Sequence, residues 1–170
     1  TDGRDTMSGL DGNDINDGVQ GDDSIFGGAG DDTLIGGQGD DILDGGTGVD
    51  TVDYSDETAG INVNLNAGTA TAQSGNDQIR NLENIVAGAG NDVLIGSDVD
   101  NILAGGEGDD ILEGLGGDDT LSGGAGKDTA SYTNAEGGVT VDLAAQTASG
   151  AAGEDTLESI ENVTGSAHDD

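Results

Sequence analysis

Along much of this chain one aliphatic residue recurs every nine residues, between glycine-rich and acidic stretches. In segment 27–35 (Gly-Gly-Ala-Gly-Asp-Asp-Thr-Leu-Ile) the main aliphatic residue is the eighth, and segment 36–44 repeats the arrangement. Because neighbouring side chains of a strand point to opposite faces, the eighth residue would face a core and its neighbours would face solvent. The eighth position is filled by Met7, Ile25, Leu34, Leu43, Val52, Leu94, Leu103, Leu112 and Leu121. Each nonapeptide therefore predicts a glycine-rich turn followed by a short strand.

Two nonapeptides make one coil of eighteen residues, with a strand on each side and a turn at each end. Coils stacked about 4.8 Å apart would form two parallel sheets around a thin aliphatic core. Asn16 and Ala130 interrupt the aliphatic column, so we expect their coils to pack least well. The predicted fold class is all-β, a parallel β-roll.

A longer period of 78 residues overlies the short one, because 60–65 aligns with 138–143 and 82–85 aligns with 160–163. In the first of these segments Ile61, Val63 and Leu65 alternate with Asn, as in a strand with one buried face. We expect the segments between the nonapeptides to be longer coils that continue the stack. Since both ends fall inside a nonapeptide, we also expect the chain to be a segment of a longer protein. The predicted organisation is a first block (1–53), a first spacer (54–86), a second block (87–131), a second spacer (132–164) and the start of a third block (165–170).

The composition argues against several classes of partner. The 36 acidic residues outnumber the 3 basic ones, giving a formal net charge of −33. A surface this acidic repels nucleic acid and anionic membranes, and no apolar run is long enough to insert into a bilayer. The chain has no cysteine and one histidine, His168, so zinc and copper lack a ligand set. Low hydrophobicity with high net charge is typical of disordered chains, which describes the expected metal-free state.

The sixth position of the nonapeptide predicts a metal site. Glycine lets the turn adopt positive φ and bring its carbonyls to one side, where the sixth-position carboxylate is also directed. Many oxygen ligands in loose geometry suit Ca²⁺ better than Mg²⁺, which requires a near-ideal octahedron. The sixth-position residues are Asp5, Asp14, Asp23, Asp32, Asp41, Asp50, Asp92, Asn101, Asp110, Asp119 and Asp128.

Stacking predicts which of these residues meet. Turns of alternate nonapeptides lie above one another, so an ion between two coils would contact acids eighteen residues apart. The predicted edges are Asp5, Asp23 and Asp41; Asp14, Asp32 and Asp50; Asp92, Asp110 and Asp128; and Asn101 with Asp119. Filling every gap gives about seven ions as a minimum. The Asn101 site lacks one charge and should be the weakest, while the spacer acids Asp77 and Asp155 are weaker candidates for further sites.

These repeats resemble the RTX (repeats-in-toxin) family, whose signature is the nonapeptide G-G-x-G-x-D-x-U-x. The resemblance implies a right-handed parallel β-roll with calcium in its turns, and export from Gram-negative bacteria through the type I secretion machinery. It also implies that backbone carbonyls at the first and third positions join the Asp ligands. The corresponding residues are Gly27, Ala29, Gly36, Gln38, Gly45, Thr47, Gly105, Glu107, Gly114 and Gly116.

We expect no catalysis within this segment, because no histidine is placed to activate a serine and few aromatics exist to line a sugar cleft. Any catalytic domain would lie outside it. The first functional hypothesis is a calcium-binding structural module of a secreted bacterial protein, unfolded in low calcium and folding on extracellular Ca²⁺. The alternative is a repeat unit of an extracellular adhesin stalk, surface layer or filament that associates along its axis. A third, an ice- or polysaccharide-binding face, has weak support from Asn62, Asn64 and Asn66.

Overall fold

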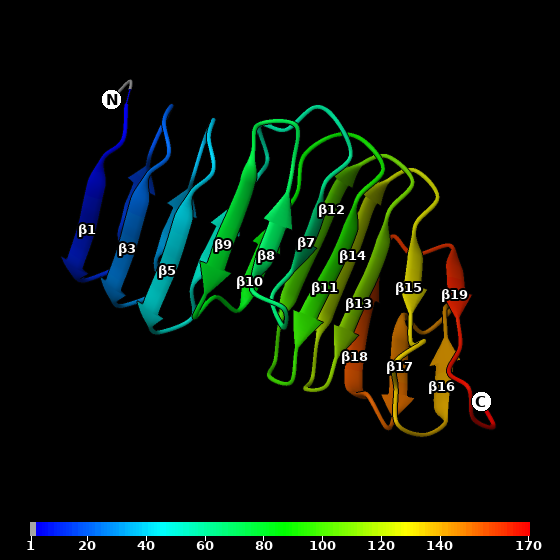
Figure 1. Ribbon diagram of the computed structural model, residues 1–170. Coiled ribbons are helices and arrows are strands. Elements are labelled where there is room, and N and C mark those ends of the chain that lie inside the picture. Colours follow the sequence, from blue (N-terminus) through cyan, green and yellow to red (C-terminus); the bar gives the residue numbers. More distant parts are fainter. Residues whose placement is uncertain (1–2) are drawn as a thin grey trace.

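The computed structural model describes residues 3–170, and all its regular elements are strands, arranged in two sheets (Figure 1). Residues 1 and 2, which open the predicted first block, lie outside the described residues. In spatial order sheet 1 contains β1 (Thr6–Asp11), β3 (Ser24–Ala29), β5 (Ile42–Thr47), β9 (Asn76–Arg80), β8 (Thr69–Thr71), β7 (Asn62–Asn64), β11 (Val93–Ser97), β13 (Ile111–Leu115), β15 (Thr129–Ser131) and β19 (Asn162–Thr164). Sheet 2 contains β16 (Val139–Asp142), β17 (Thr147–Gly150), β18 (Gly153–Glu158), β14 (Thr120–Ala125), β12 (Ile102–Glu107), β10 (Asn84–Val86), β6 (Thr51–Asp53), β4 (Thr33–Ile35) and β2 (Ile15–Asp17).

Within the blocks the strands pair in parallel with a register of eighteen residues. Thr6 lies opposite Ser24 in sheet 1, and Ile15 lies opposite Thr33 in sheet 2. Consecutive strands therefore alternate between the sheets, so that each coil adds one strand to each of them. This arrangement confirms the predicted all-β, parallel β-roll.

The core is the aliphatic column between the two sheets. Its fully buried members include Ile25, Leu34, Leu43, Val52, Leu94, Leu103, Leu112 and Leu121, each 0% exposed. The expectation of poor packing is wrong for Ala130, which is also 0% exposed and lies between Leu112 and Val163 in the sheet. The expectation of poor packing fits Asn16, whose Nδ2 is buried without a hydrogen bond.

The spacers differ from the predicted longer coils. In the first spacer β8 runs antiparallel to both β7 and β9, and in the second β17 runs antiparallel to β16 and β18 (Figure 1). The chain reverses where a strand ends on an Asx turn: Oδ1 of Asn64 accepts from the N–H of Ala67, and Oδ1 of Asp142 accepts from that of Ala144. Such turns make the tight reversal that an antiparallel pair requires. The prediction of an uninterrupted parallel stack was therefore wrong in the spacers.

The two spacers insert their extra strands into opposite sheets. The first adds β9, β8 and β7 to sheet 1 but only β10 to sheet 2. The second adds β18, β17 and β16 to sheet 2 but only β19 to sheet 1. Equivalent strands of the two 78-residue copies thus lie on opposite sheets. In both copies the last block strand of each sheet pairs in parallel with a spacer strand, as β5 does with β9, β6 with β10, β14 with β18 and β15 with β19.

Candidate metal centre

The sixth-position residues form hydrogen-bonded ladders along the edges of the roll. In seven pairs, Oδ1 of an Asp accepts from the backbone N–H of the sixth-position residue eighteen positions earlier. The distances from donor to acceptor are 2.7 Å for Asp5 to Asp23, 2.8 Å for Asp14 to Asp32, 2.7 Å for Asp23 to Asp41, 2.8 Å for Asp32 to Asp50, 2.8 Å for Asp92 to Asp110, 2.8 Å for Asn101 to Asp119 and 2.9 Å for Asp110 to Asp128. The structure therefore brings together the acids that the sequence pairs.

The second oxygen of most of these carboxylates makes no hydrogen bond in the described part of the chain. Nine buried Oδ2 atoms make no hydrogen bond, and they belong to Asp14, Asp23, Asp32, Asp41, Asp50, Asp92, Asp110, Asp119 and Asp128. Burying a charged oxygen without a hydrogen-bond donor costs free energy, and native proteins rarely contain such an unsatisfied oxygen. A row of such atoms indicates that the fold provides for a positively charged ligand.

A carbonyl oxygen from the next coil approaches several of these Oδ2 atoms. A Cβ placed on Gly9 would lie 2.6 Å from Oδ2 of Asp14 and 2.5 Å from the carbonyl oxygen of Gly27. The same pair of a carboxylate and a carbonyl oxygen faces Gly18, Gly27 and Gly105. Gly9 and Gly27 are left out of the strand pairing, since Ser8 pairs with Phe26 and Leu10 pairs with Gly28. Two oxygens thus converge on a space that only a glycine leaves open.

Eight of the ten predicted carbonyl ligands fall into two groups, while no such contact is shown within residues 3–170 for the carbonyls of Gly105 and Gly116. The first-position carbonyls of Gly27, Gly36, Gly45 and Gly114 face the preceding coil in the way just described. The third-position carbonyls of Ala29, Gln38, Thr47 and Glu107 each accept a backbone N–H from that coil, at 2.7–2.9 Å. A carbonyl has a second lone pair, so this hydrogen bond leaves each of them one further site.

Asn101 differs from the Asp residues of its column. It is 2% exposed; its Oδ1 accepts from the N–H of Ser97 at 2.6 Å, and its Nδ2 donates to the carbonyl oxygen of Glu83 at 2.7 Å. Its Oδ1 also faces Gly96 beside the carbonyl of Gly114. The side chain is therefore satisfied by the protein alone, and the weakness of its calcium site remains a prediction.

Burial perturbs the carboxylates of this site. It raises the pKa of Asp119 to about 7 and that of Asp92 to about 6, although the backbone N–H that each accepts lowers the pKa. Charged neighbours raise it further, Asp155 in the case of Asp119 and Asp110 in the case of Asp92. A bound cation would reverse this effect by stabilising the ionised form.

A second ladder lies outside the first and uses the fifth position. The N–H of Asp31 donates to Oδ1 of Asn13, and the N–H of Val49 donates to Oδ1 of Asp31, both at 3.0 Å. Here the side chain belongs to the earlier coil, the reverse of the sixth-position ladder. These exposed side chains therefore serve as hydrogen-bond acceptors within the turns.

At the end of each block the column continues into residues outside the nonapeptides. The N–H of Asp41 donates to Oδ1 of Asp77 at 2.9 Å, and the hydroxyl of Tyr54 donates to Oδ2 of Asp77 at 2.7 Å. On the other edge the N–H of Asp50 donates to Oε2 of Glu83 at 2.8 Å. Glu83 was missed in the sequence, although the alignment of 82–85 with 160–163 marks it as a repeated feature.

Both oxygen types of the site suit a hard cation. Among the described residues no three His, Cys, Asp or Glu side chains gather as a metal cluster, so backbone oxygens must complete the coordination. Ca²⁺ accepts such mixed carboxylate and carbonyl sets in flexible geometry, whereas zinc and copper prefer nitrogen and sulfur. The donor set therefore fits calcium.

Comparison with known proteins gives the same result. A family profile described as the RTX calcium-binding nonapeptide repeat (4 copies) matches residues 1–15, 17–52, 83–98 and 95–130, which is more than half of the chain. No curated protein matches the chain. The described part of the chain contains no helix of the length and hydrophobicity that crossing a bilayer requires. The chain belongs to the RTX calcium-binding nonapeptide repeat family.

Proposed function

We propose that this chain is a structural module of a secreted bacterial protein, unfolded in low calcium and folded by extracellular Ca²⁺. The observation that carries the proposal is the row of nine buried Oδ2 atoms without partners, in a chain whose net charge is −33. Without a cation, folding must place these carboxylates in the roll unpaired. With a cation in each gap, the same atoms become ligands.

The energetic argument concerns the balance between folding and repulsion. The aliphatic core is one residue deep, so it offsets little of the chain entropy lost on folding. Facing carboxylates add repulsion that strengthens as the surroundings become less polar. Calcium removes the repulsion, and its binding free energy becomes folding free energy because the site does not exist in the unfolded chain.

Calcium concentration would then decide where the chain folds. Extracellular calcium modules bind with Kd values of about 10⁻⁴–10⁻³ M, well above cytosolic calcium. A chain tuned to this range stays unfolded in the cytosol, in a form that a type I secretion channel can thread, and folds outside the cell. The module itself carries out no chemistry in this account, and its parent protein would supply any enzymatic domain.

A calcium titration followed by circular dichroism tests this function. We expect little strand signal in calcium-free buffer and a cooperative gain as Ca²⁺ rises into the millimolar range. Mg²⁺ at the same concentration should not replace it, because Mg²⁺ requires octahedral geometry and retains its waters. A complete strand signal in the absence of calcium would rule the proposal out.

An edge of sheet 2 favours a second function, a repeat unit that associates along its axis. In the first copy β7 pairs in parallel with β11, which covers it. The equivalent strand of the second copy, β16, is an edge strand of sheet 2 and lines an apolar groove with Val163. By the 78-residue period, the strand that would pair with β16 belongs to the nonapeptide that begins at 165–170, so a further repeat of this pattern, in the same chain or in another, fits this edge. Light scattering in saturating calcium tests this, since a strict monomer at high protein concentration would exclude it.

A further inference from the structure

Each block ends on a glutamate that replaces the next sixth-position Asp. Oε2 of Glu83 accepts from the N–H of Asp50 at 2.8 Å, and Oε2 of Glu161 accepts from that of Asp128 at 2.9 Å. Inside the block, the N–H of Asp32 makes the same contact with Oδ1 of Asp50 at 2.8 Å. The glutamates thus extend the carboxylate ladder by one step into each spacer, although no nonapeptide lies there.

A backbone carbonyl accompanies each glutamate. A Cβ on Gly45 would lie close to both the carbonyl oxygen of Asn81 and Oδ2 of Asp50, the latter at 2.7 Å. In the second copy the carbonyl oxygen of Ser159 faces Gly123 in the same way. These carbonyls occupy the position that first-position glycine carbonyls hold within the blocks.

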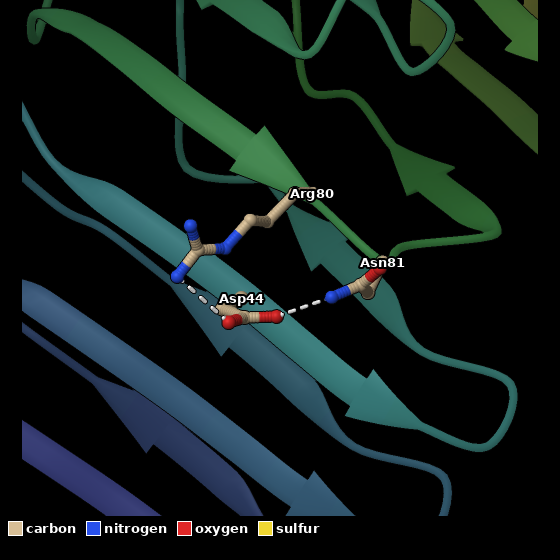
Figure 2. A network of polar contacts seen from close by, with 3 residues as sticks. All are labelled: Asp44, Arg80 and Asn81. Carbon is tan, nitrogen blue, oxygen red and sulfur yellow. Dashed lines mark hydrogen bonds and ion pairs between the residues drawn. The ribbon is translucent and has the colours of Figure 1, made fainter.

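The backbone of the first spacer is shaped to present this carbonyl. Asn81 has φ 50° and Ser159 has φ 51°, a left-handed conformation that residues with a Cβ seldom adopt. The side chain of Asn81 donates to Oδ1 of Asp44 at 2.7 Å, and Arg80 pairs with Oδ2 of Asp44 at 2.9 Å (Figure 2). This network ties the turn to β5, the last strand of the first block in sheet 1, and holds the Asn81 carbonyl toward Gly45.

The atom that points to a ligand is Oδ2 of Asp50. Asp50 is 1% exposed, and this oxygen makes no hydrogen bond although it lies beside the Asn81 carbonyl. Asp128 is 0% exposed and its Oδ2 also makes no hydrogen bond, while its Cβ and Cγ lie with the Ser159 carbonyl oxygen around Gly123. Each place therefore combines a buried carboxylate oxygen without a donor, a carbonyl and a second carboxylate.

The other edge of the first block ends differently. Oδ2 of Asp77 accepts from the Tyr54 hydroxyl, so a protein donor replaces any cation on that carboxylate. Oδ2 of Asp41 is also unpartnered, but the three atoms nearest a Cβ on Gly36 all belong to Asp41, and no carbonyl of the next coil is among them. At this end no carbonyl oxygen of the described residues comes as close to Gly36 as the Asn81 carbonyl comes to Gly45.

We propose that Asp50, Glu83 and the Asn81 carbonyl hold an additional Ca²⁺ ion, and that Asp128, Glu161 and the Ser159 carbonyl hold its equivalent, while the end at Asp77 holds none. The inference rests on the proposed calcium-binding function. These two ions join each block to the spacer that follows it. Through the hydrogen bond from Asn101 to the Glu83 carbonyl, the first ion also links the spacer to the second block.

Counting bound calcium in the whole chain, by native mass spectrometry and by calorimetry, tests the proposal. We expect Glu83→Gln and Glu161→Gln each to lose one ion at saturating calcium, and the double variant to lose two. Glutamine keeps an oxygen that accepts the N–H of Asp50 or Asp128, so the fold should persist, which circular dichroism checks. The matched control Asp77→Asn removes a spacer carboxylate at the other edge and should keep the wild-type count.

The results separate this inference from the proposed function. A wild-type chain that binds no calcium refutes the function. A wild-type chain that binds calcium, with an unchanged count in both glutamate variants, refutes only the spacer sites, and so does the loss of an ion from Asp77→Asn. If Glu83→Gln fails to fold, Glu161→Gln decides, because Glu161 is exposed and lies near the last coil of the stack.

Discussion

A methyl group placed between two ligand oxygens should displace an ion, and Gly105→Ala makes that change. The new Cβ would lie within 2.7 Å of Oδ2 of Asp110 and of the carbonyl oxygen of Gly123, and the latter belongs to the rigid backbone of the next coil. Gly105 is buried and does not have positive φ, so the substitution tests the space rather than the backbone conformation. We expect one calcium ion fewer per molecule.

The loss of stability follows from two terms. Overpacking a buried position costs about 1–3 kcal/mol, and losing an ion held at about 100 times its Kd costs about 2.7 kcal/mol, together about 4–6 kcal/mol. With an m-value of about 2 kcal/mol/M, the urea midpoint in saturating calcium should fall by about 2–3 M. Urea unfolding and native mass spectrometry on the same sample measure both effects.

Gly12→Ala provides the control. Gly12 has φ 115°, but a Cβ there would meet no atom within 4 Å, so the change costs only the left-handed conformation, about 1–2 kcal/mol. Its calcium count should equal that of wild type. Alanine does occur naturally at the first position of one nonapeptide, as Ala87. The backbone differs there from that at Gly105, because the following residue, Gly88, lacks the positive φ that Gly106 has. Gly105→Ala with the full calcium count and the stability of the control would refute the reasoning.

Three further outcomes are expected. Burial raises the pKa of Asp92 to about 6 and that of Asp119 to about 7, so the protonated groups stabilise the calcium-free fold fully below about pH 4, and this contribution is lost as pH rises through 7. Circular dichroism of the calcium-free protein should therefore show more strand at pH 5 than at pH 8. Equal spectra at the two pH values would contradict this. Tyr54→Phe leaves Oδ2 of Asp77 buried without its donor and should lower the free energy of unfolding by about 1–3 kcal/mol at an unchanged calcium count, whereas wild-type stability in urea would exclude a role for that hydroxyl. Asn101→Asp restores the missing charge and should tighten the weakest step of a calorimetric calcium titration; an unaltered titration would show that this position does not limit affinity.

The sequence predicts the blocks well because their period fixes two features at once. The eighth position places Leu34 and Leu103 in the core, and the sixth places Asp32 and Asp50 one above the other. Both follow from an eighteen-residue coil, which leaves no freedom of register. The existence of two sheets and the pairing of acids were therefore predictable without coordinates.

The spacers were less predictable because alternation specifies a strand but not its direction. Val63 and Ala70 are both buried between more exposed neighbours, and only the turn between them makes their strands antiparallel. The residues Asn64 to Gly68 form that turn, which carries Asn and Gly as reversals commonly do.

Glu83 was missed for a similar reason. A glutamate outside the nonapeptide carries no nine-residue signal, and its place in the ladder depends on how the spacer returns to the block. Asp77 was a candidate from the sequence, but its hydrogen bond from Tyr54 depends on tertiary contacts between distant segments.

The most direct test of this account is a crystal structure of the chain in calcium, with anomalous scattering used to locate the ions. The account predicts peaks between successive coils beside Oδ2 of Asp14, Asp32 and Asp110, each also contacting a backbone carbonyl of the next coil, with a further peak between Asp50 and Glu83. Peaks confined to the outer fifth-position ladder, at Asp31 and Asp109, with none beside the buried Oδ2 atoms, would contradict it.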